Sequence, residues 1–316
     1  MCTAMTLQSQ SGEQFFGRTM DFSHDIKPQL YIIPNSYQWN SLLDGQTFTD
    51  IYRFIGFGQE LDDMLAFFDG VNEHGFAAAV LYFAGYAQYQ NDLTDNTTQY
   101  LASIDFLHYI LGSCASVQEL SERIDGISVA GITDPVTNTI APLHWIVTDK
   151  SGACAVIEPT KEGLEFINNP IGVMANSPSF PWHMTNLRNY MGATPTQKQE
   201  VNWGNVRLTP FGQGQGTMPL PGGFTSPERF VRTSYLKTHI PVPKSSQEGI
   251  ISCFHIMESV SIPKGAVITS QNADDYTKYT AFINTNTCEY FYKTYDNINI
   301  TTASLWHTES DYYTKR

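Results

Sequence analysis

The second residue of the chain is a cysteine, and a thiol at that position is rarely there for packing. An initiator methionine that precedes a small residue is normally removed. We therefore expect Met1 to be lost, which leaves Cys2 with both a thiol and a free α-amine. An α-amine titrates near about pH 8, so it can accept the thiol proton and later protonate a leaving amine. Cys2 would then supply a nucleophile and its base together.

A short hairpin predicted at the N-terminus returns two charged residues to Cys2. Residues 3–8 and 14–21 have the pattern of strands, and residues 11–13 form a tight connection between them. The second strand carries Arg18 and Asp21. An arginine beside a thiol favours the thiolate, and an aspartate can hold the α-ammonium in place. The same residues also fit a non-catalytic interpretation, in which Cys2 merely follows the start codon, Arg18 is exposed and Asp21 belongs to an ordinary turn.

The rest of the chain alternates strand and helix patterns. Further strands are predicted at 52–58, 76–83, 143–148, 153–158, 164–168, 279–284, 289–295 and 302–306. Helices are predicted at 101–112, 117–124, 228–240 and 247–260. The Gly- and Pro-rich stretch 209–223 is too short for a domain linker. The pattern predicts one α+β domain over residues 1–316 with packed sheets.

Composition limits the function classes. The 316 residues are 41% hydrophobic and 16% charged, which is typical of a soluble globular protein. The net charge of -13, without a basic cluster, argues against nucleic acid as a partner. We expect no membrane span, no secretory signal and a cytoplasmic location. The five widely spaced cysteines include no CxxC pair, so we expect free thiols and no metal site.

The chain resembles the choloylglycine hydrolase and penicillin V acylase family of N-terminal-nucleophile hydrolases along nearly its whole length. The matching segments are the MCTxxT start, RTMDF at 18–22, DGVNEHG at 69–75, and 81–87, 142–145, 172–178, 211–214, 220–222, 229–232 and 295–297. The resemblance implies an αββα sandwich, in which two antiparallel sheets lie between helix layers, and a homotetramer. It implies hydrolysis of a linear amide through a thioester, with neither a metal nor an organic cofactor.

The family's functional residues fall on six positions of this sequence. The resemblance gives Cys2 as the nucleophile, with Asn176 and the backbone N–H of residue 82 as donors to the oxyanion that forms on the attacked carbonyl. It gives Arg18 and Asp21 as charged partners of Cys2, and Arg229 as a further site residue. The six residues are Cys2, Arg18, Asp21, Tyr82, Asn176 and Arg229.

Position 82 also bears on the substrate. Bile salt hydrolases of the family usually carry Asn there and penicillin V acylases usually carry Tyr, as this chain does. We therefore expect a small-molecule N-acyl amide of the penicillin V type, with an apolar or aromatic acyl group on a small polar amine. Conjugated bile salts are the alternative, and acylated signalling lactones or N-acyl amino acids remain open. One departure from the family is Ala175, where Thr commonly precedes the Asn.

Two other classes of protein are alternatives. A catalytically inactive ligand-binding homologue would be favoured if Met1 stayed attached, because a blocked amine cannot act as a base. A papain-like hydrolase would use another cysteine with a histidine, but no local signature of that kind surrounds Cys114, Cys154, Cys253 or Cys288.

Overall fold

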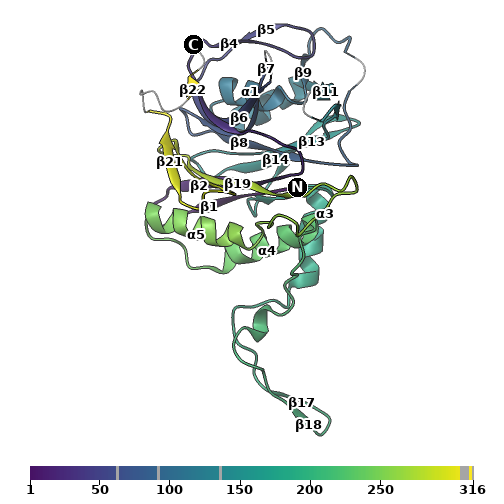
Figure 1. Cartoon of the computed structure of the whole chain (residues 1–316), viewed down its shortest axis with the longest axis vertical. Helices are drawn as coiled ribbons and strands as arrows, with labels where there is room; N and C mark the ends of the chain where they lie inside the picture. Colours follow the sequence, from purple (N-terminus) through teal and green to yellow (C-terminus); the bar gives the residue numbers. More distant parts are fainter. Residues whose placement is uncertain (62–63, 91–92, 135–136, 307–312, 315–316) are drawn as a thin grey trace.

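The computed structural model describes residues 1–316 except 62–63, 91–92, 135–136, 307–312 and 315–316. Two β-sheets lie face to face, and helices cover the outer face of each, so the layers run helix, sheet, sheet, helix (Figure 1). One apolar core lies between the sheets and continues to the helices that cover the smaller sheet, and a second lies between the larger sheet and its helices. The predicted αββα sandwich is confirmed.

The smaller sheet has six antiparallel strands and contains the N-terminal hairpin near its centre. The turn of this hairpin contains Gly12, whose φ of 85° lies in the left-handed region that glycine adopts without strain. In spatial order the strands are β16 (Val173–Met174), β1 (Cys2–Gln8), β2 (Gln14–Phe22), β19 (Tyr276–Asn284), β20 (Glu289–Thr294) and β21 (Thr301–Ser304).

The larger sheet has eight strands, and all its pairs are antiparallel except the one between β22 and β3. Most of its central strands are buried on both faces, as expected for a sheet with a core on each side. In spatial order the strands are β15 (Gly163–Asn168), β14 (Cys154–Thr160), β13 (Leu143–Thr148), β8 (Ala77–Tyr82), β7 (Met64–Asn72), β6 (Phe54–Leu61), β3 (Gln29–Ile33) and β22 (Tyr313–Thr314).

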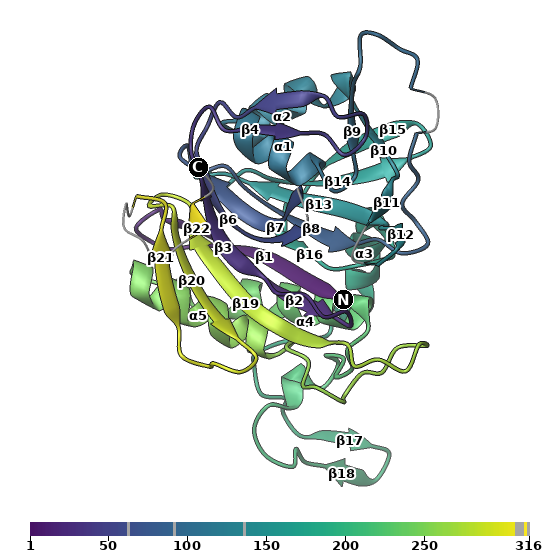
Figure 2. The ribbon, with the colours of Figure 1, turned by 45° about the horizontal axis from the view of Figure 1, so that its top comes forward.

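Helices α1 (Phe106–Ser113) and α2 (Val117–Arg123) cover the larger sheet, whereas α4 (Ser226–His239) and α5 (Ser246–Glu258) cover the smaller one (Figures 1 and 2). Ser116 caps the N-terminus of α2, because its Oγ accepts a hydrogen bond from the backbone N–H of Glu119. The remaining elements are α3 (Phe180–Asn186), β4 (Gln38–Asn40), β5 (Thr47–Thr49), β9 (Gln99–Ala102), β10 (Ile127–Ala130), β11 (Thr133–Asp134), β12 (Thr139–Ile140), β17 (Val201–Trp203), β18 (Val206–Leu208) and the 3₁₀ turns Ile124–Gly126, Leu187–Tyr190 and Gln215–Thr217.

The first predicted helix begins five residues late. Residues 101–112 have helical periodicity, but Leu101 belongs to β9, which pairs in parallel with β10. Helix α1 starts only after Asp105. Pairing with a distant strand outweighs the local preference here, as is common for short apolar runs. The prediction also missed β3, β7, α3 and the hairpin of β17 and β18, which projects from the body (Figures 1 and 2).

None of the helices in the described part of the chain is long and apolar enough to cross a membrane.

Candidate active site

The hairpin of β1 and β2 places Arg18 beside the thiol of Cys2. Cys2 pairs with Met20 and Ala4 pairs with Arg18, so Cys2 and Arg18 are diagonal neighbours on one face of the sheet. Arg18 Nη2 lies 2.6 Å from Cys2 Sγ, and both side chains are buried between the two sheets. An arginine at this distance stabilises the thiolate over the thiol.

Arg18 also bridges two strands of the opposite sheet where their pairing stops. Strands β7 and β8 are paired only as far as Asp69 and Ala79. Beyond that pair, the carbonyl oxygens of Phe68 and Val80 both accept hydrogen bonds from Arg18 Nη1, at 2.9 and 2.6 Å. The guanidinium thus holds the two diverging strands and is itself held in place against the thiol.

A buried carboxylate provides negative charge near Arg18. Asp69 is only 1% exposed and accepts hydrogen bonds from the hydroxyls of Tyr279 at 2.5 Å and Tyr290 at 2.9 Å. Burial raises the pKa of Asp69, while the charge of Arg18 opposes that shift. Burial works to lower the pKa of Arg18, but the nearby Cys2, Tyr279 and Asp69 more than offset it, so the pKa is raised and Arg18 stays charged.

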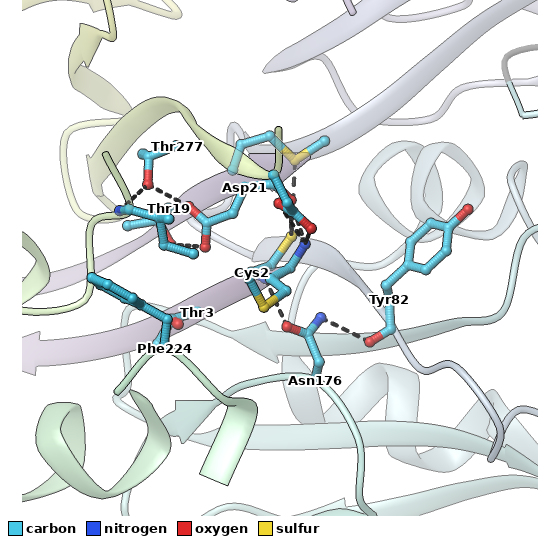
Figure 3. Close-up of polar contacts among 12 residues, drawn as sticks. Cys2, Thr3, Thr19, Asp21, Tyr82, Asn176, Phe224 and Thr277 are labelled. Atoms are coloured by element: carbon cyan, nitrogen blue, oxygen red, sulfur yellow. Dashed lines mark hydrogen bonds and ion pairs between the residues drawn. The ribbon is translucent and has the colours of Figure 1, made fainter. Parts of the chain in front are cut away.

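The opposite face of the hairpin carries Asp21. Its two carboxylate oxygens accept hydrogen bonds from Thr277 Oγ1 at 2.6 Å and from Thr19 Oγ1 at 3.0 Å (Figure 3). Burial raises the pKa of Asp21, and the positive charge of Arg229 is the largest influence that opposes it. The carboxylate is fixed in one orientation close to the start of the chain.

Arg229 on α4 holds the backbone at Cys2. Its Nη1 donates to the carbonyl oxygen of Cys2 and to Thr3 Oγ1, each at 2.5 Å, and its Nη2 donates to Asn176 Oδ1 at 2.7 Å. The side chain is fully buried, which lowers the pKa of Arg229 although Asp21 and Cys2 work against the shift. Arg229, which lies in the helix layer, therefore fixes the positions of Cys2 and Asn176 by hydrogen bonds.

Asn176 connects Cys2 to strand β8. Its Oδ1 accepts from the backbone nitrogen of Cys2 at 2.7 Å, and its Nδ2 donates to the carbonyl oxygen of Tyr82 at 2.8 Å (Figure 3). These contacts fix the side-chain amide and leave one N–H of Nδ2 for another acceptor. The backbone of Asn176 is held by His183 Nε2 at 2.8 Å, and burial lowers the pKa of His183 to about 4, so this ring is neutral near pH 7.

Met1 is present in the structure and blocks the α-amine of Cys2. The Met1 ammonium contacts the backbone oxygen of Asp21 at 2.6 Å and a carboxylate oxygen of Asp275 at 3.2 Å. The nitrogen of Cys2 is then an amide nitrogen, which has no basic lone pair. Removal of Met1 would turn that nitrogen into an amine directly beside the thiol.

A mainly apolar pocket opens at Cys2 and contains about 790 Å³ of empty space, part of it continuous with solvent. Phe22 and Tyr82 form a tilted aromatic pair across its wall, with ring centroids 5.6 Å apart. Other residues that line the pocket are Met20, Ile26, Ala66, Phe68, Val80 and Leu81.

The six residues predicted for the site come together around Cys2 from both sheets and from the helix layer. The sequence interpretation missed the residues that support them, although Thr3, Thr19 and Asp69 lay in segments that resembled the family. The others lie outside those segments; they are His183, Asp275, Thr277, Tyr279 and Tyr290. Within the described ranges, no three His, Cys, Asp or Glu side chains gather as a metal site requires.

Residues 2–314 match the family of linear amide C–N hydrolases described as the choloylglycine hydrolase family. The chain belongs to this family. It is therefore an enzyme that hydrolyses amide bonds. Cys2, Arg18, Asp21 and Tyr82 line the pocket described above. The predicted family is confirmed.

The relatives of this chain include a bile salt hydrolase and a penicillin V acylase, the two kinds of enzyme that the sequence suggested. A bile salt hydrolase/transferase of Clostridium perfringens is 33% identical over 96% of this chain and 92% of its own. A crystal structure of the mutant C2A conjugated bile acid hydrolase from Clostridium perfringens has a TM-score of 0.89, with 30% identity over 100% of this chain and 97% of its own. A penicillin V acylase of Pectobacterium atrosepticum is 26% identical over 90% of this chain and 74% of its own.

Proposed function

We propose that Cys2, freed of Met1, hydrolyses N-acyl amides through a thioester. The α-amine of Cys2 takes the thiol proton, the thiolate attacks the carbonyl carbon, and the proton passes to the leaving amine. Water then attacks the thioester with the same amine as base, which releases the acid. The contact of 2.6 Å between Arg18 and Cys2 Sγ at the mouth of an apolar pocket carries this proposal.

The surrounding residues have distinct roles in this proposal. The free N–H of Asn176 Nδ2 and the backbone N–H of Tyr82 stabilise the oxyanion. Asp21 orients the α-ammonium, and Arg18 favours the thiolate. Arg229 holds the carbonyl group of Cys2 and the side-chain amide of Asn176 in fixed positions relative to each other.

We propose a penicillin V type substrate, with an aromatic acyl group on a small polar amine. The support is the aromatic pair of Phe22 and Tyr82 on the pocket wall, since aromatic rings pack favourably against an aromatic acyl group. Conjugated bile salts are the second candidate. The relatives that favour them are 30–33% identical over 96% of this chain, whereas the penicillin V acylase is 26% identical.

Values of kcat/KM for penicillin V and for glycine- and taurine-conjugated bile salts separate these candidates. We expect penicillin V to be cleaved at least about tenfold better, because its phenoxy ring packs on Phe22 and Tyr82. The variant Tyr82→Asn should lose most of that preference. Tyr86→Asn is the matched control, because Tyr86 is exposed and lies outside the pocket lining.

A higher kcat/KM for conjugated bile salts than for penicillin V would instead support a bile salt hydrolase. If mass spectrometry shows that Met1 is absent and neither substrate is cleaved, acylated signalling lactones and N-acyl amino acids are the next substrates to assay. If Met1 is retained and neither substrate is cleaved, an inactive ligand-binding role is favoured.

We also propose that the chain assembles as a homotetramer through the projecting hairpin of β17 and β18. Apolar side chains on this arm are exposed, including Trp203 at 74% and the fully exposed Phe211. Exposed apolar surface of this kind is typical of a protein interface. The arm stands away from the body, where it can reach a second copy of the chain (Figure 2).

The double variant Trp203→Asp, Phe211→Ser is expected to sediment as a smaller species than the tetramer. Analytical ultracentrifugation measures the masses, and Ile298→Ser, which changes an equally exposed apolar residue elsewhere, is the control. An unchanged tetramer mass in the double variant would exclude the arm as the interface.

A further inference from the structure

The Met1 ammonium occupies a cation site next to the thiol of Cys2. Its nitrogen donates to the backbone oxygen of Asp21 at 2.6 Å and to Asp275 Oδ2 at 3.2 Å. The same backbone oxygen of Asp21 lies 3.9 Å from Cys2 Sγ, so the ammonium and the thiol share one neighbouring atom. Met1 and Asp21 both line the pocket at Cys2. Two acceptors beside the pocket are therefore already arranged around a primary ammonium group.

Loss of Met1 takes away the partner of the Asp275 carboxylate. Asp275 is only 8% exposed. Among the residues that the structure describes, the Met1 ammonium alone forms a hydrogen bond or an ion pair with this carboxylate. A buried carboxylate that loses its cation carries a large desolvation cost unless another cation replaces it. The new α-amine does not fill this place, because the Cys2 nitrogen is already held by Asn176 Oδ1 at 2.7 Å.

The leaving amine of a substrate enters the space that Met1 vacates. In the proposed mechanism the α-amine of Cys2 passes its proton to the leaving nitrogen, which must then lie within hydrogen-bond distance of the Cys2 nitrogen. Met1 is bonded to that same nitrogen and lines the pocket, so its atoms mark the space available there. Only the carbonyl carbon and Cα of Met1 separate its ammonium from the Cys2 nitrogen. A group on a short chain of the leaving amine therefore reaches the cation site.

We propose that Asp275 and the backbone oxygen of Asp21 form a subsite for a second, positively charged amino group on the leaving amine. The inference rests on the proposed function, because the direction of the leaving amine follows from the proton transfer. The preferred substrates are then N-acyl amides of short diamines, with the acyl group in the apolar pocket. A leaving amine that carries a carboxylate, as in penicillin V and in glycine conjugates, is repelled by Asp275.

Three phenoxyacetyl amides that differ only in the leaving amine test this subsite. The amines are 1,3-diaminopropane, butylamine and glycine, and butylamine replaces the distal ammonium of the diamine by a methyl group. We expect kcat/KM for the diaminopropane amide to exceed that for the butyl amide roughly tenfold, the effect of about one charge-assisted hydrogen bond. The glycine amide should have the lowest kcat/KM of the three.

The variant Asp275→Asn removes the charge with little change in size. It should bring the kcat/KM ratio of the diaminopropane and butyl amides close to one. It should also raise kcat/KM for the glycine amide, a gain that a merely damaged site would not show. Asp296→Asn is the matched control, because it removes the same charge from an exposed position outside the pocket lining. An equal loss for all three amides would assign Asp275 to the Cys2 amine and overturn the subsite.

Calorimetric titration of the variant Cys2→Ala, with the loss of Met1 verified by intact mass, tests the subsite without cleavage. The diaminopropane amide should bind roughly tenfold more tightly than the butyl amide, and this advantage should vanish when Asp275→Asn is added. Equal affinities of the two amides for Cys2→Ala would overturn the subsite. The expected difference in affinity, without cleavage of any of the three amides by the wild type, would retain the subsite and refute the proposed hydrolysis.

Discussion

The variant Cys2→Ala is expected to lose amide hydrolysis almost completely, with kcat falling by roughly 10⁴-fold or more. The thiol is the only nucleophile in the proposed mechanism, and alanine still permits removal of Met1. Rates of acid release, measured with intact mass to verify the N-terminus, provide the test. Cys154→Ala is the matched control, since Cys154 is a free thiol that does not line the pocket.

A second variant separates the role of the α-amine from that of the thiol. A short uncleavable extension before Met1 keeps Cys2 in the chain but leaves its nitrogen in an amide bond. Hydrolysis should fall by a similar factor, while iodoacetamide should still alkylate Cys2. Full activity of the extended protein would show that another group serves as the base, and retained activity in Cys2→Ala would exclude the thiol mechanism.

The variant Asn176→Ala is expected to lower kcat by about 10²–10³-fold with a much smaller change in KM. The free N–H of Asn176 Nδ2 is proposed to bond the oxyanion, which exists only after attack begins. Asn176→Asp retains the Oδ1 that accepts from Cys2 and Arg229 but loses the amide donor, so it should be similarly impaired. Steady-state kinetics on the preferred amide measures both constants.

Asn189→Ala is the control, because it removes the same side-chain amide from an exposed position. Thermal unfolding shows whether the replacement of a buried hydrogen-bonding group has also destabilised the fold. A kcat within about threefold of the wild type in a folded Asn176→Ala would remove Asn176 from the oxyanion site.

The predicted strands were found within a few residues of their places because apolar alternation and turn residues are local properties. β13 lies where its pattern predicted, and β1 and β2 form the expected hairpin. The register of that hairpin also follows from its short turn, so the approach of Arg18 to Cys2 is already present in the first twenty residues. The helix predicted from residue 101 was wrong in its first turn, because the partner of β9 is 28 residues away along the chain.

The sequence by itself determined the pair of Cys2 and Arg18, since a strand period of two and a tight turn place them on one face. It also named Asn176 and Arg229, but only by resemblance. Tertiary structure alone decided how these residues meet, because β16 brings Asn176 to the edge of β1, and α4 brings Arg229 against the same strand.

Tertiary structure also decided the shape of the pocket. The divergence of β7 from β8 opens the sheet, and no local pattern encodes it, because it depends on the guanidinium of Arg18 taking the carbonyl groups of Phe68 and Val80. Local sequence specifies strands and turns. Which hydrogen bonds neighbouring strands form is a property of the packed sheets, and that property shapes the pocket beside Cys2.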